Sequence, residues 1–242
     1  MGRSICDAIA ADPDLELVAV VDPRAAGVEV HGLTIGAELR GLADAGAEVV
    51  IDFTVADAAR VTLPWLAMHG IHAVVGTTGL SEDDIDTFRS AFSGSNCLIT
   101  SNFAISAVLM MRFAELAAPY FDSAEIVELH HDGKADAPSG TAVATAKRMA
   151  AASADWAPDR TQHEVYPGAR GGKGPAGIRI HALRLRGVIA HQEVILGTVG
   201  QTLTIRQDSY DNASYMPGIL LACKKVSSVP GLTVGLDGYM DL

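Results

Sequence analysis

The chain has 242 residues, of which 49% are hydrophobic and 19% charged, a composition typical of a folded globular protein. Its formal net charge of −11 argues against nucleic acid as the main partner. If the substrate is anionic, the positive groups that bind it must be few and local. We find no apolar run of membrane-spanning length, no secretory signal, and three cysteines without metal-ligand spacing. We therefore expect a cytoplasmic protein of one large or two ordinary domains, with no membrane partner.

The first hundred residues alternate between strand-like and helical patterns. Apolar runs rich in β-branched residues predict strands over 15–21, 47–54, 72–76 and 97–100. Helical patterns cover 56–69 and 82–92, with Ser81 as the expected N-cap of the second. Strands that alternate with helices predict a parallel sheet covered on both faces, a Rossmann-like doubly wound α/β fold.

From about residue 103 the pattern changes. Helices are expected over 104–119, 141–152 and 216–226, and strands over 124–130, 178–185, 191–196 and 202–207. The glycine-rich stretch 168–177 is expected to be mobile. Consecutive strands without long crossovers predict an open mixed, largely antiparallel sheet in an α+β domain. We assign residues 1–102 and 216–242 to a dinucleotide-binding domain, and residues 103–215 to a substrate-binding domain.

The front of the sequence departs from the usual dinucleotide-binding unit. Asp22 stands at the end of an expected strand, where such units place the acid that binds the adenosine ribose. Counting back about 20 residues reaches Gly2, which fits the last glycine of the motif, with residues 3–11 as the first helix. The preceding strand and the earlier glycines are not in the sequence. Alternatively, Asp22-Pro23 merely ends a strand.

The segment 128–141 gathers groups that suit acid–base chemistry. His130, His131 and Lys134 fall within five residues in a loop that follows a strand. Asp136 to Thr141 then enters a helix, whose first N–H groups and hydroxyls suit a carboxylate or phosphate. The other interpretations are a solvated histidine and a plain helix cap. We expect no metal, because no third ligand stands nearby at a suitable spacing.

This segment reads Glu-Leu-His-His-x-x-Lys-x-Asp-Ala-Pro-Ser-Gly-Thr-Ala, and it resembles the signature of the dihydrodipicolinate reductases, also called 4-hydroxy-tetrahydrodipicolinate reductases. The resemblance extends over nearly the whole chain. Blocks that match the family in the right order lie at 51–54, 75–79, 101–104, 190–193 and 230–236. The resemblance implies reduction by NADH or NADPH of a cyclic, unsaturated dicarboxylic imine to tetrahydrodipicolinate, a step of diaminopimelate and lysine synthesis.

The resemblance also assigns roles around the histidine pair. His130 would donate or accept the proton, Lys134 would be the second proton donor and a carboxylate partner, and His131 would contact the substrate. Ser139, Gly140 and Thr141 would hold a substrate carboxylate, in agreement with the anion site expected from the sequence.

For the cofactor, the resemblance points to loops at the ends of strands in the first domain. Asp22 would bind the adenosine ribose, which favours NADH, while Arg24 would tolerate a 2′-phosphate, so that dual use is expected. The full set of cofactor-binding residues is Met1, Gly2, Asp22, Arg24, Phe53, Thr54, Gly76, Thr77, Thr78, Thr100, Ser101, Asn102 and Phe103.

Two departures from the family pattern stand out. The Gly-x-x-Gly-Arg-Met-Gly-Arg turn survives only as Met1-Gly2-Arg3, for which our hypothesis is a start chosen too late or a shortened chain. Asn212 stands where we expect an arginine that binds substrate, with Arg170 or Arg184 as possible substitutes.

Two other functions compete with a reductase of this family. One is a dicarboxylate-binding relic that no longer holds a cofactor, because the pyrophosphate loop is missing. The other is a dehydrogenase acting on aspartate or homoserine, which would share the front domain but lack the His-His-Lys loop. The family forms tetramers by pairing the open sheets of the second domain, so we expect a homotetramer.

Overall fold

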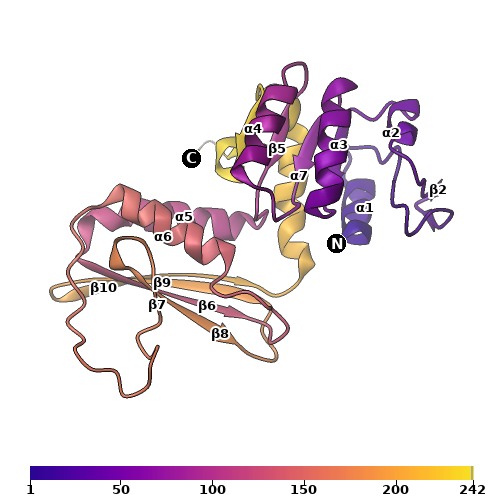
Figure 1. Ribbon diagram of the computed structural model, residues 1–242. Helices are drawn as coiled ribbons and strands as arrows, with labels where there is room; N and C mark the ends of the chain where they lie inside the picture. The colour runs from indigo at the N-terminus through magenta and orange to yellow at the C-terminus, as the bar shows by residue number, and fades with distance from the viewer. Residues whose placement is uncertain (241) are drawn as a thin grey trace. The chain divides into compact units, whose positions relative to one another are not determined.

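The computed structural model describes residues 1–240 and 242, and they form two compact units (Figure 1). Unit 1 contains Met1–Phe103 and Tyr215–Leu242, and unit 2 contains Ala104–Ser214. Within the described residues, no helix is both long enough and apolar enough to cross a bilayer.

Unit 1 is built on a four-stranded parallel sheet. Its strands are β3 (Val49–Asp52), β4 (His72–Val75), β5 (Cys97–Ile99) and β11 (Leu232–Val234). The strand order is β11-β5-β4-β3, and every pairing is parallel. Three of these strands lie where the apolar runs predict them. We did not anticipate β11, because three residues after the Pro230-Gly231 turn are too few to show a periodic pattern.

Both faces of this sheet are buried. Ala73 and Val75 point into a cluster formed with Leu63 and Leu66 of α3 and Phe88 of α4. Val74 and Leu98 point to the other face and are also fully buried, and there β4 contacts α7. Burial on both sides explains why these strands read as continuous apolar runs rather than as alternating ones.

The helices of unit 1 lie where the sequence predicts them, apart from the short helix Arg40–Asp44, which was not anticipated. They are α1 (Gly2–Ala11), α2 (Arg40–Asp44), α3 (Ala56–Met68), α4 (Glu82–Ala91) and α7 (Met216–Lys225), with 3₁₀ turns at Val226–Ser228 and Leu236–Tyr239. The side chain of Ser81 caps α4, and Asp84 completes a capping box, so the expected N-cap is confirmed. Pairs of these helices pack together, α3 with α4 and α1 with α7.

The expected strand over residues 15–21 is not formed. This segment makes one isolated parallel bridge, between Val21 and Gly36, with Gly36 N–H donating to Val20 O at 2.9 Å and Asp22 N–H donating to Gly36 O at 3.0 Å. It is followed by the short hairpin of β1 (Glu29–Val30) and β2 (Leu33–Thr34). The prediction was wrong because an apolar run becomes a strand only when a neighbour satisfies its backbone along its length.

Unit 2 contains a five-stranded mixed sheet. Its strands are β6 (Ser123–His130), β7 (Gly172–Lys173), β8 (Arg179–Arg184), β9 (Ala190–Thr198) and β10 (Gln201–Ser209), in the order β10-β9-β6-β8-β7. Only the pair of β6 and β8 is parallel, which confirms the largely antiparallel prediction. The glycine-rich stretch 168–177 contributes β7 and the 3₁₀ turn Pro175–Gly177, so part of it is regular structure.

Two helices, α5 (Ile105–Ala117) and α6 (Gly140–Ala152), lie side by side over one face of this sheet (Figure 1). Gln192 of β9 donates to Thr145 of α6 at 2.8 Å, which identifies the covered face. The register pairs Gln192 with Glu128, so Glu128 and, by alternation, His130 also point to the helix side. Glu125 and Val127 point to the opposite face. Further 3₁₀ turns lie at Ala118–Tyr120 and Asn212–Tyr215.

Candidate functional site

In unit 1, the parallel register brings three strand-end loops to one edge of the sheet. Asp52 pairs with Val75, and Val75 with Ile99, so β3, β4 and β5 end level with one another. The loops that begin at Phe53, Gly76 and Thr100 therefore start side by side. In open parallel sheets this edge is the usual place for a ligand.

A buried carboxylate joins the first two of these loops. Asp52 is 3% exposed, and its Oδ1 accepts from Thr54 N–H at 3.0 Å, from Thr54 Oγ1 at 2.7 Å and from Thr77 Oγ1 at 2.7 Å. Thr77 Oγ1 in turn accepts from Thr54 N–H at 2.9 Å. These bonds fix the position of Thr54 relative to Thr77 across 23 residues of chain.

Aromatic packing connects the same loops with the third. The Phe53 and Phe103 rings lie with centroids 5.4 Å apart, and a Cβ at position 76 would come within 2.4 Å of the Phe53 ring. Gly76 is therefore required for the close approach of Phe53. Phe103 is held by α7, because a Cβ on Gly218 would lie 2.0 Å from the Phe103 carbonyl oxygen.

The expected cofactor residues of these loops fall into two sets. Thr54, Thr78 and Ser101 are exposed at the edge, where a ligand can reach them. Thr77, Thr100 and Phe103 are buried and hold the backbone of the loops in place. The Thr100 hydroxyl, for example, donates to the Asn102 carbonyl at 3.1 Å.

The remaining expected cofactor residues lie near the front of the chain. Met1 is the N-cap of α1 and Gly2 is its first residue, so the first N–H groups of a helix stand where a pyrophosphate was expected. Asp22 and Arg24 are exposed, and Asp22 Oδ1 accepts from Arg24 N–H at 2.9 Å. The Asp22 carboxylate therefore shapes its own turn and remains exposed.

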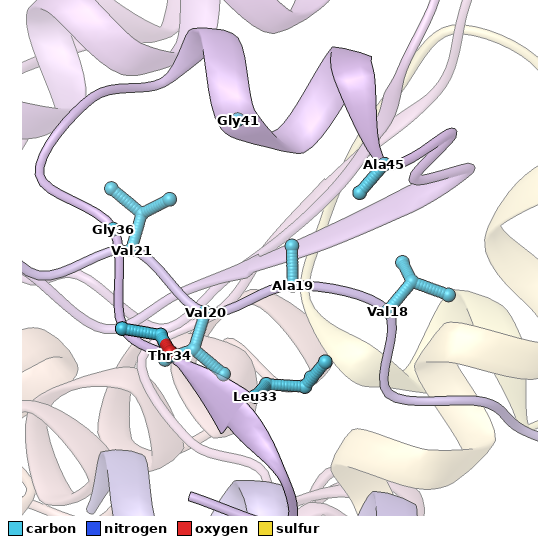
Figure 2. A pocket seen from close by; sticks show the side chains of 9 residues that line it. All are labelled: Val18, Ala19, Val20, Val21, Leu33, Thr34, Gly36, Gly41 and Ala45. Atoms are coloured by element: carbon cyan, nitrogen blue, oxygen red, sulfur yellow. The ribbon is translucent and has the colours of Figure 1, made fainter. Parts of the chain in front are cut away.

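An apolar pocket lies directly before Asp22. Figure 2 shows Val18, Ala19, Val20 and Val21 along one wall, and its other lining residues are Leu33, Thr34, Gly36, Gly41 and Ala45. No titratable side chain lines it, so the pocket itself offers no acid–base chemistry.

Unit 2 places its titratable groups at the carboxyl end of β6. His130 Nδ1 lies 2.6 Å from Glu128 Oε2, and Glu128 is fully buried. The two Glu128 oxygens also accept from the Arg184 guanidinium at 2.9 and 3.0 Å, and Oε1 accepts from Ser139 N–H at 3.0 Å. One carboxylate thus connects the histidine, β8 and the start of α6.

Lys134 and His131 lie in the loop that follows. Lys134 Nζ is 2.6 Å from Asp136 Oδ1, and Arg184 donates to the Asp136 carbonyl at 2.7 Å, so the loop that carries Lys134 is tied to β8. His131 is exposed. The structure therefore brings His130 and Lys134 into one cluster and leaves His131 at its rim.

Ser139 serves as a helix cap and as part of the cluster at once. Its side chain accepts from Ala142 N–H at 3.2 Å as the N-cap of α6, while its own N–H donates to Glu128. The Ser139 N–H is thus already bonded within the protein, and the expected contact of Ser139 with a substrate carboxylate stays a prediction. Gly140, which is exposed, and Thr141 are the first helical positions of α6.

These contacts set the protonation states of the cluster. Burial alone would raise the pKa of Glu128, but hydrogen bonds from Arg184, His130 and Ser139 hold that pKa below its ordinary value. Burial is the main cause that lowers the pKa of His130, with smaller contributions from the Lys134 and Arg184 charges, against the opposing effect of Glu128. Near neutral pH the histidine is therefore mainly neutral beside an ionised Glu128.

The two arginines considered as substitutes for Asn212 are both engaged. Arg184 binds Glu128. Arg170 lies 2.6 Å from Glu125, whose side chain points to the opposite face of β6 from His130. Asn212 itself begins the 3₁₀ turn that ends unit 2. Within residues 1–240 and 242, no group of three His, Cys, Asp or Glu side chains is arranged to hold a metal ion.

Sequence reasoning gave no role to Glu128 or Asp52, and it considered Arg184 only as a substitute for an arginine at position 212. Glu128 had a signal, because positions two apart on a strand share a face and Glu-x-His therefore places the carboxylate beside the imidazole. No sequence signal placed Arg184 beside Glu128, because the two residues meet only through the parallel pairing of β6 with β8.

A doubly wound parallel sheet joined to a second unit with acid–base groups at a strand end is the organisation of a two-domain, nucleotide-dependent reductase. Comparison with known families makes this specific. Residues 1–103 match the family model "Dihydrodipicolinate reductase, N-terminus", and residues 106–240 match "Dihydrodipicolinate reductase, C-terminus". The chain belongs to the dihydrodipicolinate reductase family.

Individual relatives agree. The chain is 48% identical to a 4-hydroxy-tetrahydrodipicolinate reductase of Nocardia farcinica, over 100% of this chain and 95% of that protein. It is 55% identical to the enzyme of that name from Thermobifida fusca, over 81% and 82%. A dipicolinate-bound dihydrodipicolinate reductase from Paenisporosarcina sp. TG-14 superposes with a TM-score of 0.88 at 33% identity, covering 98% of this chain and 94% of that one.

The hydrogen bonds around Asp52 lead to a prediction about stability. Replacing Thr77 by Val removes a buried hydroxyl that both donates to Asp52 and accepts from Thr54, and this should lower the free energy of unfolding by about 1–3 kcal/mol. Denaturant unfolding measures the loss, and amide hydrogen exchange should accelerate at residues 53–56. The matched control is Thr78→Val at the exposed neighbour, expected to change stability by less than about 0.5 kcal/mol. Equal effects of the two substitutions would contradict the assignment.

Proposed function

We propose that this chain is a 4-hydroxy-tetrahydrodipicolinate reductase, which uses NADH or NADPH to reduce a cyclic dicarboxylic imine to tetrahydrodipicolinate for lysine and diaminopimelate synthesis. The observation that carries the proposal is the cluster of His130, Lys134 and the first turn of α6 around Glu128. It combines a proton donor, a cation and an anion site at one strand end. Family membership supports the same reaction, and so does dipicolinate, a planar dicarboxylate, bound to the Paenisporosarcina relative.

In this proposal, each group has a task that follows from its chemistry. A bound nicotinamide would supply the hydride, and negative charge would then develop on the ring system of the substrate. His130, in its protonated form, donates the proton that neutralises this charge, and Lys134 stabilises it. Gly140 and Thr141 hold a substrate carboxylate at the start of α6. The exposed residues Thr54, Thr78 and Ser101 contact the cofactor.

Substitution in the cluster tests the proposed roles. His130→Gln and Lys134→Met should each lower kcat by about 10²–10⁴-fold, the contribution of a well-placed acid or charge. Steady-state reduction of the enzymatically generated imine measures this. The controls are His163→Gln and Lys147→Met, two exposed positions that should retain full activity. Full activity of either cluster variant would refute the role given to that residue.

Nucleotide binding tests the cofactor proposal on the chain as it stands. Titration with NADH and NADPH, followed by calorimetry, should give a Kd near the micromolar scale, about −8 kcal/mol. Asp22→Ala should weaken NADH more than NADPH, because only NADH offers both ribose hydroxyls to the carboxylate. A chain that binds dipicolinate but neither nucleotide would instead be a dicarboxylate-binding relic.

We further propose a cytoplasmic homotetramer formed through the face of the unit 2 sheet that α5 and α6 leave open. That face combines half-buried apolar side chains, among them Val127 and Ile195, with the ion pairs of Glu125. A surface of this kind is typical of a subunit contact.

Light scattering should therefore give the mass of four chains, and Val127→Glu should give smaller species, because it places a charge in the centre of this face. Val199→Glu, at a position 94% exposed, is the control and should leave the mass unchanged. A monomeric wild-type chain would overturn the tetramer.

A further inference from the structure

Glu128 is a buried carboxylate with four hydrogen bonds, and the proposed reaction gives it no direct part. Glu128 has no exposed surface, and its oxygens receive four hydrogen bonds from three separate segments: His130 on β6, Arg184 on β8 and Ser139 at the start of α6. A buried charge is retained only when its partners satisfy it, and here one of these partners is the histidine of the cluster.

The chemistry of the carboxylate restricts the histidine. An ionised carboxylate can only accept hydrogen bonds, so at 2.6 Å the proton on His130 Nδ1 must point to Glu128. In the neutral imidazole the other nitrogen, Nε2, then carries a lone pair and no proton. When the ring is protonated, the added proton is therefore on Nε2, which is the proton available for transfer.

The rest of the cluster agrees with this arrangement. Arg184 Nη2 donates to Glu128 Oε1 and to the Asp136 carbonyl, and Lys134 is paired with Asp136. The charges that act on His130 are Glu128 on its own strand, Arg184 on β8 and Lys134 in the loop. Glu128 is the only one of the three that favours the protonated ring.

We propose that Glu128 is a positioning residue of the reductase, which fixes the His130 ring with its Nδ1–H on the carboxylate, keeps Nε2 as the proton-transferring atom, and couples that ring to the anion-binding start of α6 through Ser139. The catalytic assignment of Nε2 rests on the proposed function. The tautomer does not, since it follows from the contacts alone.

The first test measures the tautomer directly. In the full chain labelled with ¹⁵N-histidine, the His130 signals are identified by their loss in His130→Gln. The neutral ring should show a protonated Nδ1 and a bare Nε2. In Glu128→Gln, whose amide can accept or donate, the two tautomers should become mixed, and the His130 pKa should fall further because the favourable charge is gone. A wild-type ring protonated mainly on Nε2 would overturn the proposal, whatever the enzyme does.

The second test uses activity. Glu128→Gln should lower kcat by about 10²-fold and move the limb on which activity falls with rising pH to lower pH, because less of His130 is protonated. Glu128→Asp keeps the negative charge, and it is the second variant for this test if Glu128→Gln does not fold. It should leave that limb nearer to the wild-type position while losing part of kcat. If the tautomer is as stated but the pH limb does not move in either variant, His130 is not the proton donor and the positioning role fails for catalysis.

Discussion

The loop that joins β6 to α6 in unit 2 depends on one ion pair, between the fully buried Glu128 and the half-buried Arg184. The pair spans β6 and β8, and each partner carries a second connection: Glu128 to the N-cap of α6 and Arg184 to the Asp136 carbonyl. Removing Arg184 would destabilise the unit, because the buried Glu128 carboxylate would lose its cation. The loop between β6 and α6 would be an ordinary exposed connection without these bonds. With them, its lysine and the helix start have defined positions relative to His130.

In unit 1, a smaller set of contacts fixes the positions of the loops at the strand ends. Asp52 accepts from both threonines that flank the β3 and β4 strand ends, and the Phe53 ring fits over Gly76, where a side chain would prevent contact. The buried members of these loops therefore determine where the exposed ones stand. A substitution at Thr77 or Gly76 would therefore change the binding of a ligand that contacts neither residue, because it would shift the exposed loop residues.

Much of this could be foreseen from the sequence. The apolar runs at 49–52, 72–75 and 97–99 are buried on two sides and so have an unambiguous pattern, and Ser81 with Asp84 is a local capping signal. The run at 15–21 has the same composition, yet it is not a strand, because strand formation depends on a neighbour that composition does not reveal. Likewise, the His-His-Lys loop was evident, whereas Arg184 lies more than 50 residues away and is brought in only by β-pairing. The bond from Ser139 N–H to Glu128 could not be foreseen either, because it joins residues 11 positions apart through the fold of the loop.

The parallel pairing of β6 with β8 has a wider consequence. Together with α6, this pairing forms one β-α-β crossover unit in an otherwise antiparallel sheet. His130 and Arg184, which pair in register, therefore lie at the same end of the sheet, beside the start of the helix. The long connection from Ser153 to Ile178 contacts the opposite end of the sheet, at the amino ends of β6 and β8. There Ala157 N–H donates to the Asp122 carbonyl and Asp159 pairs with Arg179. Insertions and deletions in that connection can therefore accumulate at the amino ends of the strands, while the chemistry at their carboxyl ends stays intact.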